Sequence, residues 1–486
     1  MLFLITLLIP LAGGLLLPLL RFRTARSRGI WVETVVLAAS CLMLWQLIRR
    51  PEETVRVLPL AEGLSIAFRL DGPACVFTGL VAFLWPLATL YGLEYMEHEE
   101  RPDAFFCWYT VSYTITLAIA AAANLFTMYI FYECLTMVTL PLVTHKQDEA
   151  SVRAGRKYVV YSMTGAALGF TAMMLVYFLT GTTEFAYGGI ACPAGREDLL
   201  RILYIAAFLG FGVKAAVFPL HAWLPAASVA PTPVTALLHA VAVVNAGAYA
   251  VIRVTWYVFG PAALRGTYAQ TAALALACVT VVFGAVAAVR EQHLKRRLAY
   301  STVSNLSYML MGAALMTPDG LAGSLAHLVC HGLMKIVLFS CAGAILIGTG
   351  SEWVQEMRGY RRYLPFTCAV YAVAAVALTG IPPLAGFVSK WHLLTAAADT
   401  GTPLGTAAVA CLILATVLTA IYALSPAVFF WFQPAGKPEG MPEGGKRDPG
   451  LRMKLPLVIL TAAVIALGVW SEPLVTFLRA VAAGTL

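Results

Sequence analysis

One glutamate and three lysines lie inside long apolar segments of this 486-residue sequence, away from the charged ends of those segments. They are Glu133, Lys214, Lys335 and Lys390. A charged side chain at the centre of a membrane helix costs about 2.5–3.5 kcal/mol on insertion scales, so such residues usually face the protein interior and mark a functional pathway. Four of them in one chain favour a route for ions over a set of ion pairs that only fixes helix packing.

Histidines extend this set of titratable residues. His327, His331 and Lys335 recur at intervals of four residues in SLAHLVCHGLMKIVLF, a spacing that places them on one face of a helix, about 6 Å apart at each step. His239 lies in the same distinctive stretch as Lys214. Imidazole exchanges protons in the physiological pH range. A row of such groups along one helix face is suited to passing protons, and we predict a proton relay.

Several members of this row also have a plainer structural interpretation. Glu133 and Lys214 could form a fixed ion pair, and His239 could be a packing residue that is hydrogen-bonded within the core. Lys390 could extend its amine to the membrane surface. A metal site at His327 and His331 is disfavoured, because no third ligand is close in sequence and a neighbouring lysine would compete with the metal.

The composition indicates the surroundings of these residues. Apolar residues make up 60% of the chain and charged residues only 12%, about half the share in an average soluble domain, which excludes a soluble globular enzyme. Because a membrane-spanning helix needs about 20 apolar residues, we predict an all-α polytopic membrane protein with about fourteen transmembrane helices. The apolar segments are 2–20, 29–48, 73–93, 104–123, 126–145, 156–180, 200–219, 231–257, 269–289, 298–316, 319–349, 366–397, 405–432 and 455–480.

These segments divide the chain into four regions. Residues 1–103 carry three predicted helices, 104–257 and 258–432 carry five each, and 433–486 carry a cytoplasmic loop and the last helix. We expect the two five-helix regions to be inverted repeats with broken helices in corresponding positions, because some transporters build their midplane sites in this way.

Proline and glycine accompany the lysines of the row. Lys214 precedes Pro219, Lys390 follows GIPPLAG, and Lys335 lies in a helix that contains several glycines. Broken helices at membrane depth are tolerated where the freed backbone is buried in protein or lines a wet cavity. We therefore predict interruptions in the helices that carry all three lysines.

The predicted loops differ in basic residues from one side of the membrane to the other. The odd-numbered loops carry 21 Lys and Arg residues, and the opposite loops carry nine. Because cytoplasmic loops are enriched in Lys and Arg, we predict that the odd loops face the cytoplasm of a prokaryotic cell and that both termini lie outside it, in a multi-pass protein of the inner or plasma membrane. Segment 1–20 has no basic start and is expected to be retained as a helix.

Nothing in the sequence indicates a cofactor. The ten cysteines include no CxxC or other close cluster, and no dinucleotide fingerprint or P-loop is present. We therefore expect no cofactor and no metal in this chain, so any redox chemistry would belong to other subunits. The net charge of +8 does not indicate binding of nucleic acid, because the basic residues lie at the ends of apolar segments.

Four stretches together resemble the proton-conducting, antiporter-like subunits of the complex I superfamily, which includes NADH:quinone oxidoreductase, membrane-bound hydrogenases and Mrp-type cation/proton antiporters. These stretches are PLHAWLPAASVAPTPVTALLHA, LKRRLAYSTVSNLSYM, HLVCHGLMKIVLF and GIPPLAGFVSK. The resemblance covers roughly residues 60–480. It implies a fold of fourteen helices with two inverted five-helix repeats.

The resemblance also implies roles for the row. Glu133 matches the family's glutamate of helix 5, and Lys214 matches its lysine partner of helix 7. Lys335 resembles the central lysine of helix 11. The other matching positions are His239 in helix 8, His327 and His331 in helix 11, and Lys390 in helix 12.

Three positions depart from the family pattern. Asn245 stands where many relatives carry a lysine, so a relay step at this position of helix 8 is not expected. Ala226 follows WLP where an acid is common, and His293 precedes LKRRLAYST where an aspartate is usual. We expect the last two departures to change loop contacts more than conduction.

The sequence therefore predicts an ion-translocating subunit that carries no redox chemistry itself and moves protons through the Glu/Lys/His row. Its expected setting is a complex I-like or hydrogenase-type oxidoreductase (translocase) assembly, with other membrane subunits, the lipid bilayer and, indirectly, soluble iron–sulfur subunits as partners. The alternative is a component of a Mrp-type Na+/H+ antiporter. Protons are favoured because sodium prefers oxygen ligands and Glu133 is the only deep acid.

Overall fold

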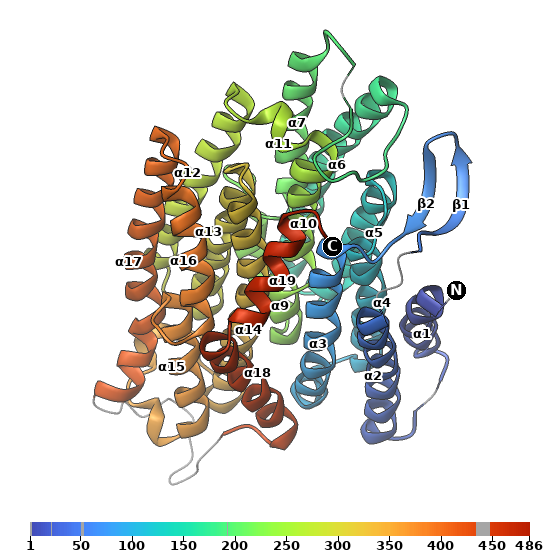
Figure 1. Ribbon diagram of the computed structural model, residues 1–486. Coiled ribbons are helices and arrows are strands. Elements are labelled where there is room, and N and C mark those ends of the chain that lie inside the picture. The colour runs from blue at the N-terminus through green and yellow to red at the C-terminus, as the bar shows by residue number, and fades with distance from the viewer. Residues whose placement is uncertain (1, 21, 50–52, 192, 434–447) are drawn as a thin grey trace.

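The computed structural model describes residues 2–20, 22–49, 53–191, 193–433 and 448–486 as a bundle of helices with one small β-hairpin (Figure 1). The first helices are α1 (Leu2–Leu16), α2 (Ala25–Arg49), α3 (Gly72–Tyr95), α4 (Pro102–Ala120), α5 (Leu125–Val143), α6 (Glu149–Thr180) and α7 (Glu197–Gly212). The next are α8 (Trp223–Ala226), α9 (Thr232–Ala240), α10 (Val243–Arg253), α11 (Pro261–Leu264), α12 (Tyr268–Arg290), α13 (Leu294–Ala314) and α14 (Pro318–Thr349). The last are α15 (Pro365–Thr379), α16 (Ala385–Ala398), α17 (Pro403–Phe432), α18 (Leu451–Val469) and α19 (Glu472–Ala482).

Capping residues set the ends of the helices that matter most for the site. The Asp71 carboxylate accepts a hydrogen bond from the backbone N–H of Ala74 and so caps the start of α3. The Thr317 hydroxyl does the same for α14 through the N–H of Gly320. Gly350, with φ of 74°, ends α14 in the left-handed conformation that glycine adopts without steric cost.

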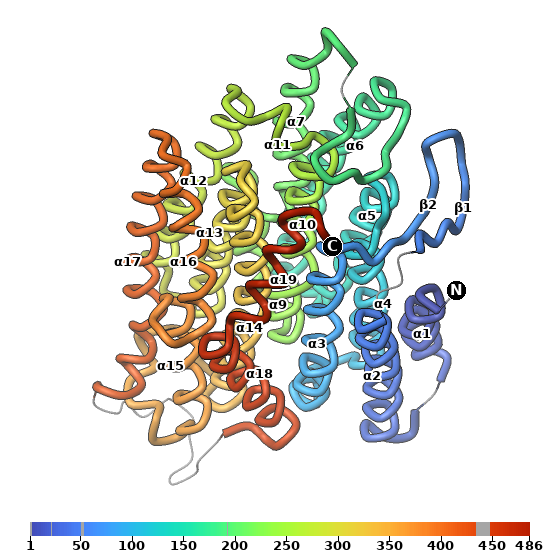
Figure 2. Tube along the Cα trace, viewed as in Figure 1, coloured from blue at the N-terminus to red at the C-terminus, as the bar shows by residue number. Residues whose placement is uncertain are grey.

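The centre of the bundle is formed by α9, α10 and α14, and α2, α17 and α18 lie at its surface (Figures 1 and 2). The most apolar stretch within Thr232–Phe259 is completely buried, and 89% of the corresponding stretch of α14 is buried. A helix that is hydrophobic on all sides requires such a central position. Polar side chains on α9 and α14 therefore face other helices and not lipid.

Nine helices among the described residues are long and apolar enough to cross a membrane, which agrees with a multi-pass membrane protein. The sequence predicted about fourteen spans. Some of the predicted spans are shorter or more polar than a standard span, because breaks divide them or because, as in α13, they carry several hydroxyl and amide side chains. The number fourteen and the inverted repeats stay predictions.

Breaks occur in two of the three lysine-bearing helices. The chain leaves helical geometry over 213–222, around Lys214, and over 380–384, just before Lys390. The predicted interruption at Lys335 is wrong, because α14 runs from Pro318 to Thr349 without a break. Its glycines serve close packing instead: a Cβ on Gly332 would lie 3.0 Å from the Ala240 carbonyl oxygen at the end of α9.

Two further features differ from the expected architecture. The single last helix expected over 455–480 is two helices, α18 and α19, since Pro473 has no backbone N–H to continue α18 and is instead tolerated in the first turn of α19. Strands β1 (Val55–Ala61) and β2 (Leu64–Phe68) form an antiparallel hairpin that turns at Gly63, where φ is 70°. This hairpin was not predicted, because its strands are short and lie between the long apolar segments that indicate helices.

Some of the basic residues on which the predicted membrane orientation depends lie outside the described residues. The basic residues concerned are Arg21, Arg50, Lys437, Lys446 and Arg447. The loop expected at the start of region 433–486 falls largely within 434–447 and also lies outside them. The orientation of the termini stays a prediction.

Candidate ion pathway

Glu133 on α5 and Lys214 form a buried ion pair. The Lys214 Nζ lies 3.8 Å from the Glu133 Oε1, with the lysine side chain fully buried and the glutamate side chain 20% exposed. Lys214 also donates a hydrogen bond to the Tyr132 carbonyl, and its Nζ lies 3.5 Å from the centre of the Tyr132 ring. A Cβ on Gly247 would lie only 2.6 Å from the Lys214 carbonyl carbon, so this glycine lets α10 approach the broken segment.

His239 lies at the end of α9, beside a second break. Its ring stacks on Phe339 of α14, with ring centroids 4.5 Å apart and planes 15° from parallel. The helix stops at Ala240 and restarts at Val243, and the Asn245 side-chain amide donates a hydrogen bond of 2.7 Å to the Ala240 carbonyl. Asn245 therefore satisfies backbone freed by the break, a structural task that needs no titratable group.

His327, His331 and Lys335 share one face of α14, as their spacing predicts. The rings of His327 and His331 are 6.1 Å apart. The His327 Nδ1 shares a hydrogen bond of 2.9 Å with the Ser389 hydroxyl of α16. Lys335 donates to the Leu298 carbonyl at 2.9 Å and also to the Ser301 hydroxyl, both on α13.

Lys390 lies on α16, just after the break that follows α15. Its Nζ donates to the carbonyls of Leu378 and Thr379, at 2.9 and 3.1 Å, which the end of α15 leaves free. The residue is 7% exposed, so its amine points into the protein and does not reach the surface. The Nζ also lies 5.5 Å from the centre of the Tyr308 ring, which in turn contacts His327.

The structure brings most of the predicted row together. His327, His331 and Lys335 share α14, and His239 of α9 packs against the same helix through Phe339. Lys390 lies beside the Tyr308 ring that contacts His327. Glu133 and Lys214 form a separate pair at the other end. Over the described part of the chain, no hydrogen bond or ion pair joins Lys214 to His239.

Several ring nitrogens of the row lack a protein partner. Both nitrogens of His239, both of His331 and the Nε2 of His327 are buried without a hydrogen bond from any described residue. Buried polar groups in proteins are almost always paired, and ordered water supplies the partner where protein does not. These nitrogens mark where water molecules would connect the row.

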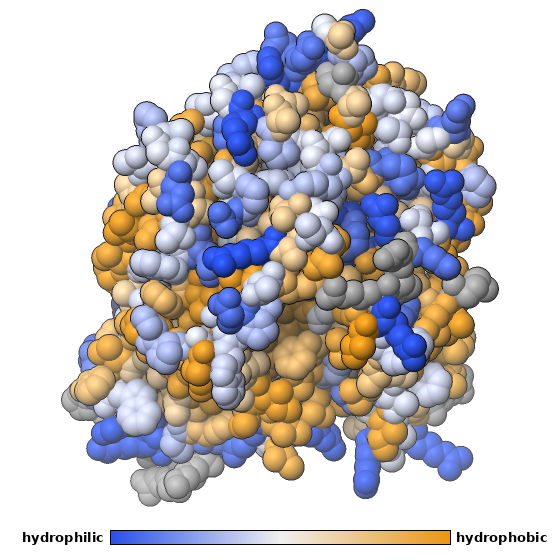
Figure 3. Space-filling model, viewed as in Figure 1, coloured by the Kyte–Doolittle hydropathy of each residue, from blue (hydrophilic) through white to orange (hydrophobic). Residues whose placement is uncertain are grey.

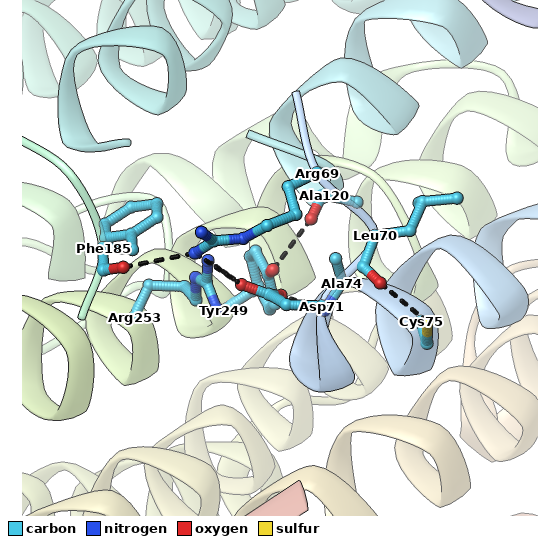
Figure 4. Close-up of polar contacts among 9 residues, drawn as sticks. All are labelled: Arg69, Leu70, Asp71, Ala74, Cys75, Ala120, Phe185, Tyr249 and Arg253. Atoms are coloured by element: carbon cyan, nitrogen blue, oxygen red, sulfur yellow. Dashed lines mark hydrogen bonds and ion pairs between the residues drawn. The ribbon is translucent and has the colours of Figure 1, made fainter. Parts of the chain in front are cut away.

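The sequence analysis did not identify a second buried charge cluster, formed by Arg69, Asp71 and Arg253 (Figure 4). Arg253, at the end of α10, is fully buried and donates to the Asp71 carboxylate at 2.7 Å. Arg69 lies 3.4 Å from the same carboxylate and donates to the Phe185 carbonyl at 3.2 Å. The apolar residues VTWYVF that follow Arg253 form a π-helix, η3 (Val254–Phe259), and they were the signal that this arginine lies within a buried segment.

The structure shows the surroundings of two of the three residues that depart from the family pattern, His293 and Ala226. The His293 Nε2 contacts the Glu352 carboxylate at 3.0 Å, and the Lys295 Nζ forms an ion pair with Glu352 at 2.8 Å. His293 thus contributes to a loop contact between the start of α13 and the end of α14. Ala226 is the last residue of α8 and is partly exposed.

Lowering the pH is expected to weaken this loop contact. Burial raises the pKa of Glu352, but the hydrogen bond from His293 and the charge of Lys295 outweigh it and lower the pKa from its ordinary 4.5 to about 2. A depressed folded-state pKa adds stability that is present above the unfolded pKa and is lost as the pH falls from about 4.5 to about 2. The melting temperature of the wild type should therefore fall more steeply across this window than that of Glu352→Gln.

Glu356→Gln is the matched control, since Glu356 is exposed, lies in the same loop and accepts a hydrogen bond from the Ser351 hydroxyl. Its melting curve should follow the wild type across the same pH range. Parallel curves for the wild type and Glu352→Gln would contradict the assignment.

No group of three or more His, Cys, Asp or Glu residues within the described ranges could hold a metal ion.

Comparison with known proteins adds independent information. The sequence profile of the family described as "NADH:quinone oxidoreductase/Mrp antiporter, TM" matches residues 122–419. NADH-quinone oxidoreductase subunit N of Desulforudis audaxviator is 28% identical over 86% of this chain and 82% of its own length. NADH-quinone oxidoreductase subunit L of Mycobacterium tuberculosis and a probable K(+)/H(+) antiporter protein of Rhizobium meliloti are each 30% identical over 84% of the chain. The chain spans 64% and 40% of the length of these two relatives.

Solved structures share the fold. A chain of respiratory complex I from Thermus thermophilus superposes with a TM-score of 0.83 at 24% identity, over 100% of this chain and 98% of that one. A chain of the Mrp complex from Dietzia gives 0.86 at 24% identity, over 99% and 52%. A chain of an archaeal membrane-bound sulfane sulfur reductase gives 0.84 at 21% identity, over 99% and 97%. All three are structures of multi-subunit membrane complexes.

Proposed function

The chain belongs to the NADH:quinone oxidoreductase/Mrp antiporter membrane family, and from this premise we propose that it conducts protons across the membrane through the row of Glu133, Lys214, His239, His327, His331, Lys335 and Lys390. The observation that carries the proposal is the grouping of buried imidazoles and amines on α9, α14 and α16, linked through the rings of Phe339 and Tyr308. The resemblance read from the sequence motifs is confirmed at the level of the family.

The arrangement supports coupled movement of charge. Lys214 has one carboxylate partner, Glu133, at 3.8 Å, while Lys335 and Lys390 have only carbonyl, hydroxyl and aromatic neighbours among the described residues. Interacting buried groups titrate as a set, so gain or loss of one proton changes the energy of its neighbours. Separation of Glu133 from Lys214 would then change the charge at one end of the row and drive a proton along it.

The same residues favour protons over sodium as the ion. Sodium requires several oxygen ligands, whereas the row presents amines and imidazoles, and only Glu133 adds a carboxylate. Positive amines would repel a metal cation. Protons therefore fit this interior better than sodium. A role as a component of a Mrp-type Na+/H+ antiporter is the second candidate, supported by the antiporter relative from Rhizobium meliloti.

We place this activity in an assembly with other membrane subunits. The two five-helix regions would be inverted repeats, with the breaks at 213–222 and 380–384 in corresponding positions. In a redox-driven assembly, soluble iron–sulfur subunits would supply the energy through neighbouring chains, whereas an antiporter would use a cation gradient. The protein would contribute no redox centre and would have both termini outside the cytoplasm of a prokaryotic cell.

Purification of the tagged chain from native membranes, with identification of every co-purifying protein, tests the setting. The recovered assembly is then reconstituted in vesicles, and internal pH is followed with a fluorescent dye. Proton uptake that depends on an electron donor supports a redox-driven pump. Uptake that needs only an imposed sodium gradient would replace it with the antiporter, and absence of any proton movement would contradict both.

Replacement of Lys390 by methionine is expected to reduce proton translocation at least tenfold. Methionine has a similar length and fills the same space, but it cannot carry a proton or hydrogen-bond to the two carbonyls at the end of α15. The measurement is proton uptake by reconstituted assemblies containing equal amounts of each variant. Translocation that stays at the wild-type level would exclude Lys390 from the row.

A further inference from the structure

A cavity of about 340 Å³ lies at the end of the bundle where α2 and α18 begin and α3 ends. It is separate from the row and is lined by three arginines, one glutamate and mainly apolar residues. The lining residues are Ala25, Arg26, Arg28, Gly29, Ile30, Glu33, Thr34, Leu37, Leu90, Leu93 and Arg452. On the face shown in Figure 3, a hollow with mainly hydrophobic walls runs between α18 and α2 toward this end of the molecule.

Two charges of the cavity are already neutralised by acids. Arg28 pairs with Asp103 at 3.1 Å, and Arg452 pairs with Glu97 at 2.8 Å. The charges left without an ion-pair partner among the described residues are one cation, Arg26, and one carboxylate, Glu33. The remaining charge is thus one positive and one negative group, which suits a zwitterion better than an anion.

Two buried polar atoms in this cavity also lack partners. The Arg28 Nε is a donor without an acceptor, and the Glu33 Oε2 is an acceptor without a donor, within the described ranges. The two residues lie about 7.5 Å apart along the helix axis at ~1.5 Å per residue, and both line the same cavity. One small headgroup with an acceptor and a donor could therefore satisfy both atoms.

The remaining walls are apolar and face outward. Ile30 is 60% exposed and Leu37 is 44% exposed on α2, and Leu90 and Leu93 on α3 form the opposite side. A water-soluble phosphate compound would gain nothing from these side chains, whereas an acyl chain would be buried against them. Apolar walls that end in arginines are typical of phospholipid sites between transmembrane helices.

We propose that this cavity binds one phosphatidylethanolamine molecule. Its phosphate accepts hydrogen bonds from the Arg28 Nε and from Arg26, and its ammonium group donates to the Glu33 carboxylate. The acyl chains lie in the hydrophobic hollow against α2 and α3. The lipid would add to the packing of α2 and α18 on α3, which at this end includes the exposed Arg452–Glu97 ion pair and contacts of Glu94 with the start of α18.

Native mass spectrometry of the full chain tests the proposal. The protein is reconstituted in nanodiscs that contain equal amounts of phosphatidylethanolamine and phosphatidylcholine, then released in mild detergent. The wild type should retain one phosphatidylethanolamine several-fold more often than phosphatidylcholine, because the choline headgroup has the same charge but no N–H donor. Glu33→Gln should bring the ratio close to one, and Arg26→Gln should reduce retention of both lipids.

Arg49→Gln is the control, since Arg49 lies at the opposite end of α2 and should not alter the ratio. Equal retention of the two lipids by the wild type would overturn the proposal, as would an unchanged preference in Glu33→Gln. Replacement of phosphatidylethanolamine by phosphatidylglycerol in a three-lipid mixture would overturn the zwitterion assignment and identify an anionic lipid site.

Discussion

Replacement of Glu133 by glutamine is expected to abolish most proton translocation, by at least tenfold, while the chain still folds and assembles. Glutamine has the same shape as glutamate but cannot ionise, so Lys214 loses the only carboxylate that lies within 4 Å of its Nζ in the described residues. The pair can then no longer alternate between charged states. Proton uptake by reconstituted assemblies measures the effect, and the yield of assembled complex measures folding.

The neighbouring Cys134 provides a matched control for this position. Cys134 follows Glu133 within the unbroken helix α5, is partly exposed and is a free thiol. Cys134→Ala should therefore leave translocation unchanged. Wild-type translocation by Glu133→Gln would contradict the row as a whole. A large loss in Cys134→Ala would show that α5 tolerates no change and that the glutamate result reports packing.

Replacement of Asp71 by asparagine is expected to destabilise the protein by about 3–5 kcal/mol, the range found when one partner of a buried ion pair is removed. Asp71 is the carboxylate shared by Arg253 and Arg69, and Arg253 is fully buried. Asparagine caps a helix as well as aspartate does, so the start of α3 is preserved and the loss reports the uncompensated guanidinium groups. Thermal unfolding in detergent, followed by intrinsic fluorescence, measures the change.

Asp198→Asn is the control, since Asp198 pairs with Arg201 at 2.7 Å and its side chain is 79% exposed. Exposed pairs contribute about 0–1 kcal/mol. If Asp71→Asn destabilised the protein no more than Asp198→Asn, the ion pairs of the Arg69–Asp71–Arg253 cluster would contribute no more stability than an exposed pair. The two aromatic faces near Arg253, Phe185 and Tyr257, at 4.2 and 4.3 Å from its guanidinium carbon, would then be the main stabilising contacts.

The titratable residues of the row could be identified from the sequence because charged residues are rare within membrane-spanning segments. A lysine within an apolar segment is costly in lipid, so Lys214, Lys335 and Lys390 stand out without any knowledge of the fold. The spacing of four residues likewise predicts the shared face of His327, His331 and Lys335 on α14. Proton-uptake measurements on the variants proposed above would test whether these residues form a relay.

Other features required the packed structure. Arg253 lies near the end of the predicted segment 231–257, and only the continuation of the helix into η3 and the position of Asp71 show that it is buried in an ion pair. Asn245 differs from the usual lysine of relatives, but its contact with the Ala240 carbonyl depends on a break that no proline or glycine marks. The unbroken course of α14 follows from neighbours that pack against its glycines, since a Cβ on Gly343 would lie 2.7 Å from the Thr232 Cγ2.

The sequence by itself determined that this is a helical membrane protein of the NADH:quinone oxidoreductase/Mrp antiporter family with titratable groups at membrane depth, because hydrophobic length and isolated charge are local properties. The tertiary structure decided which of these groups meet. Glu133 and Lys214 come from segments about 80 residues apart, and His239 stacks on Phe339 of α14 only because α9 packs against α14. Such contacts depend on helix packing across the whole bundle, and no local pattern encodes them.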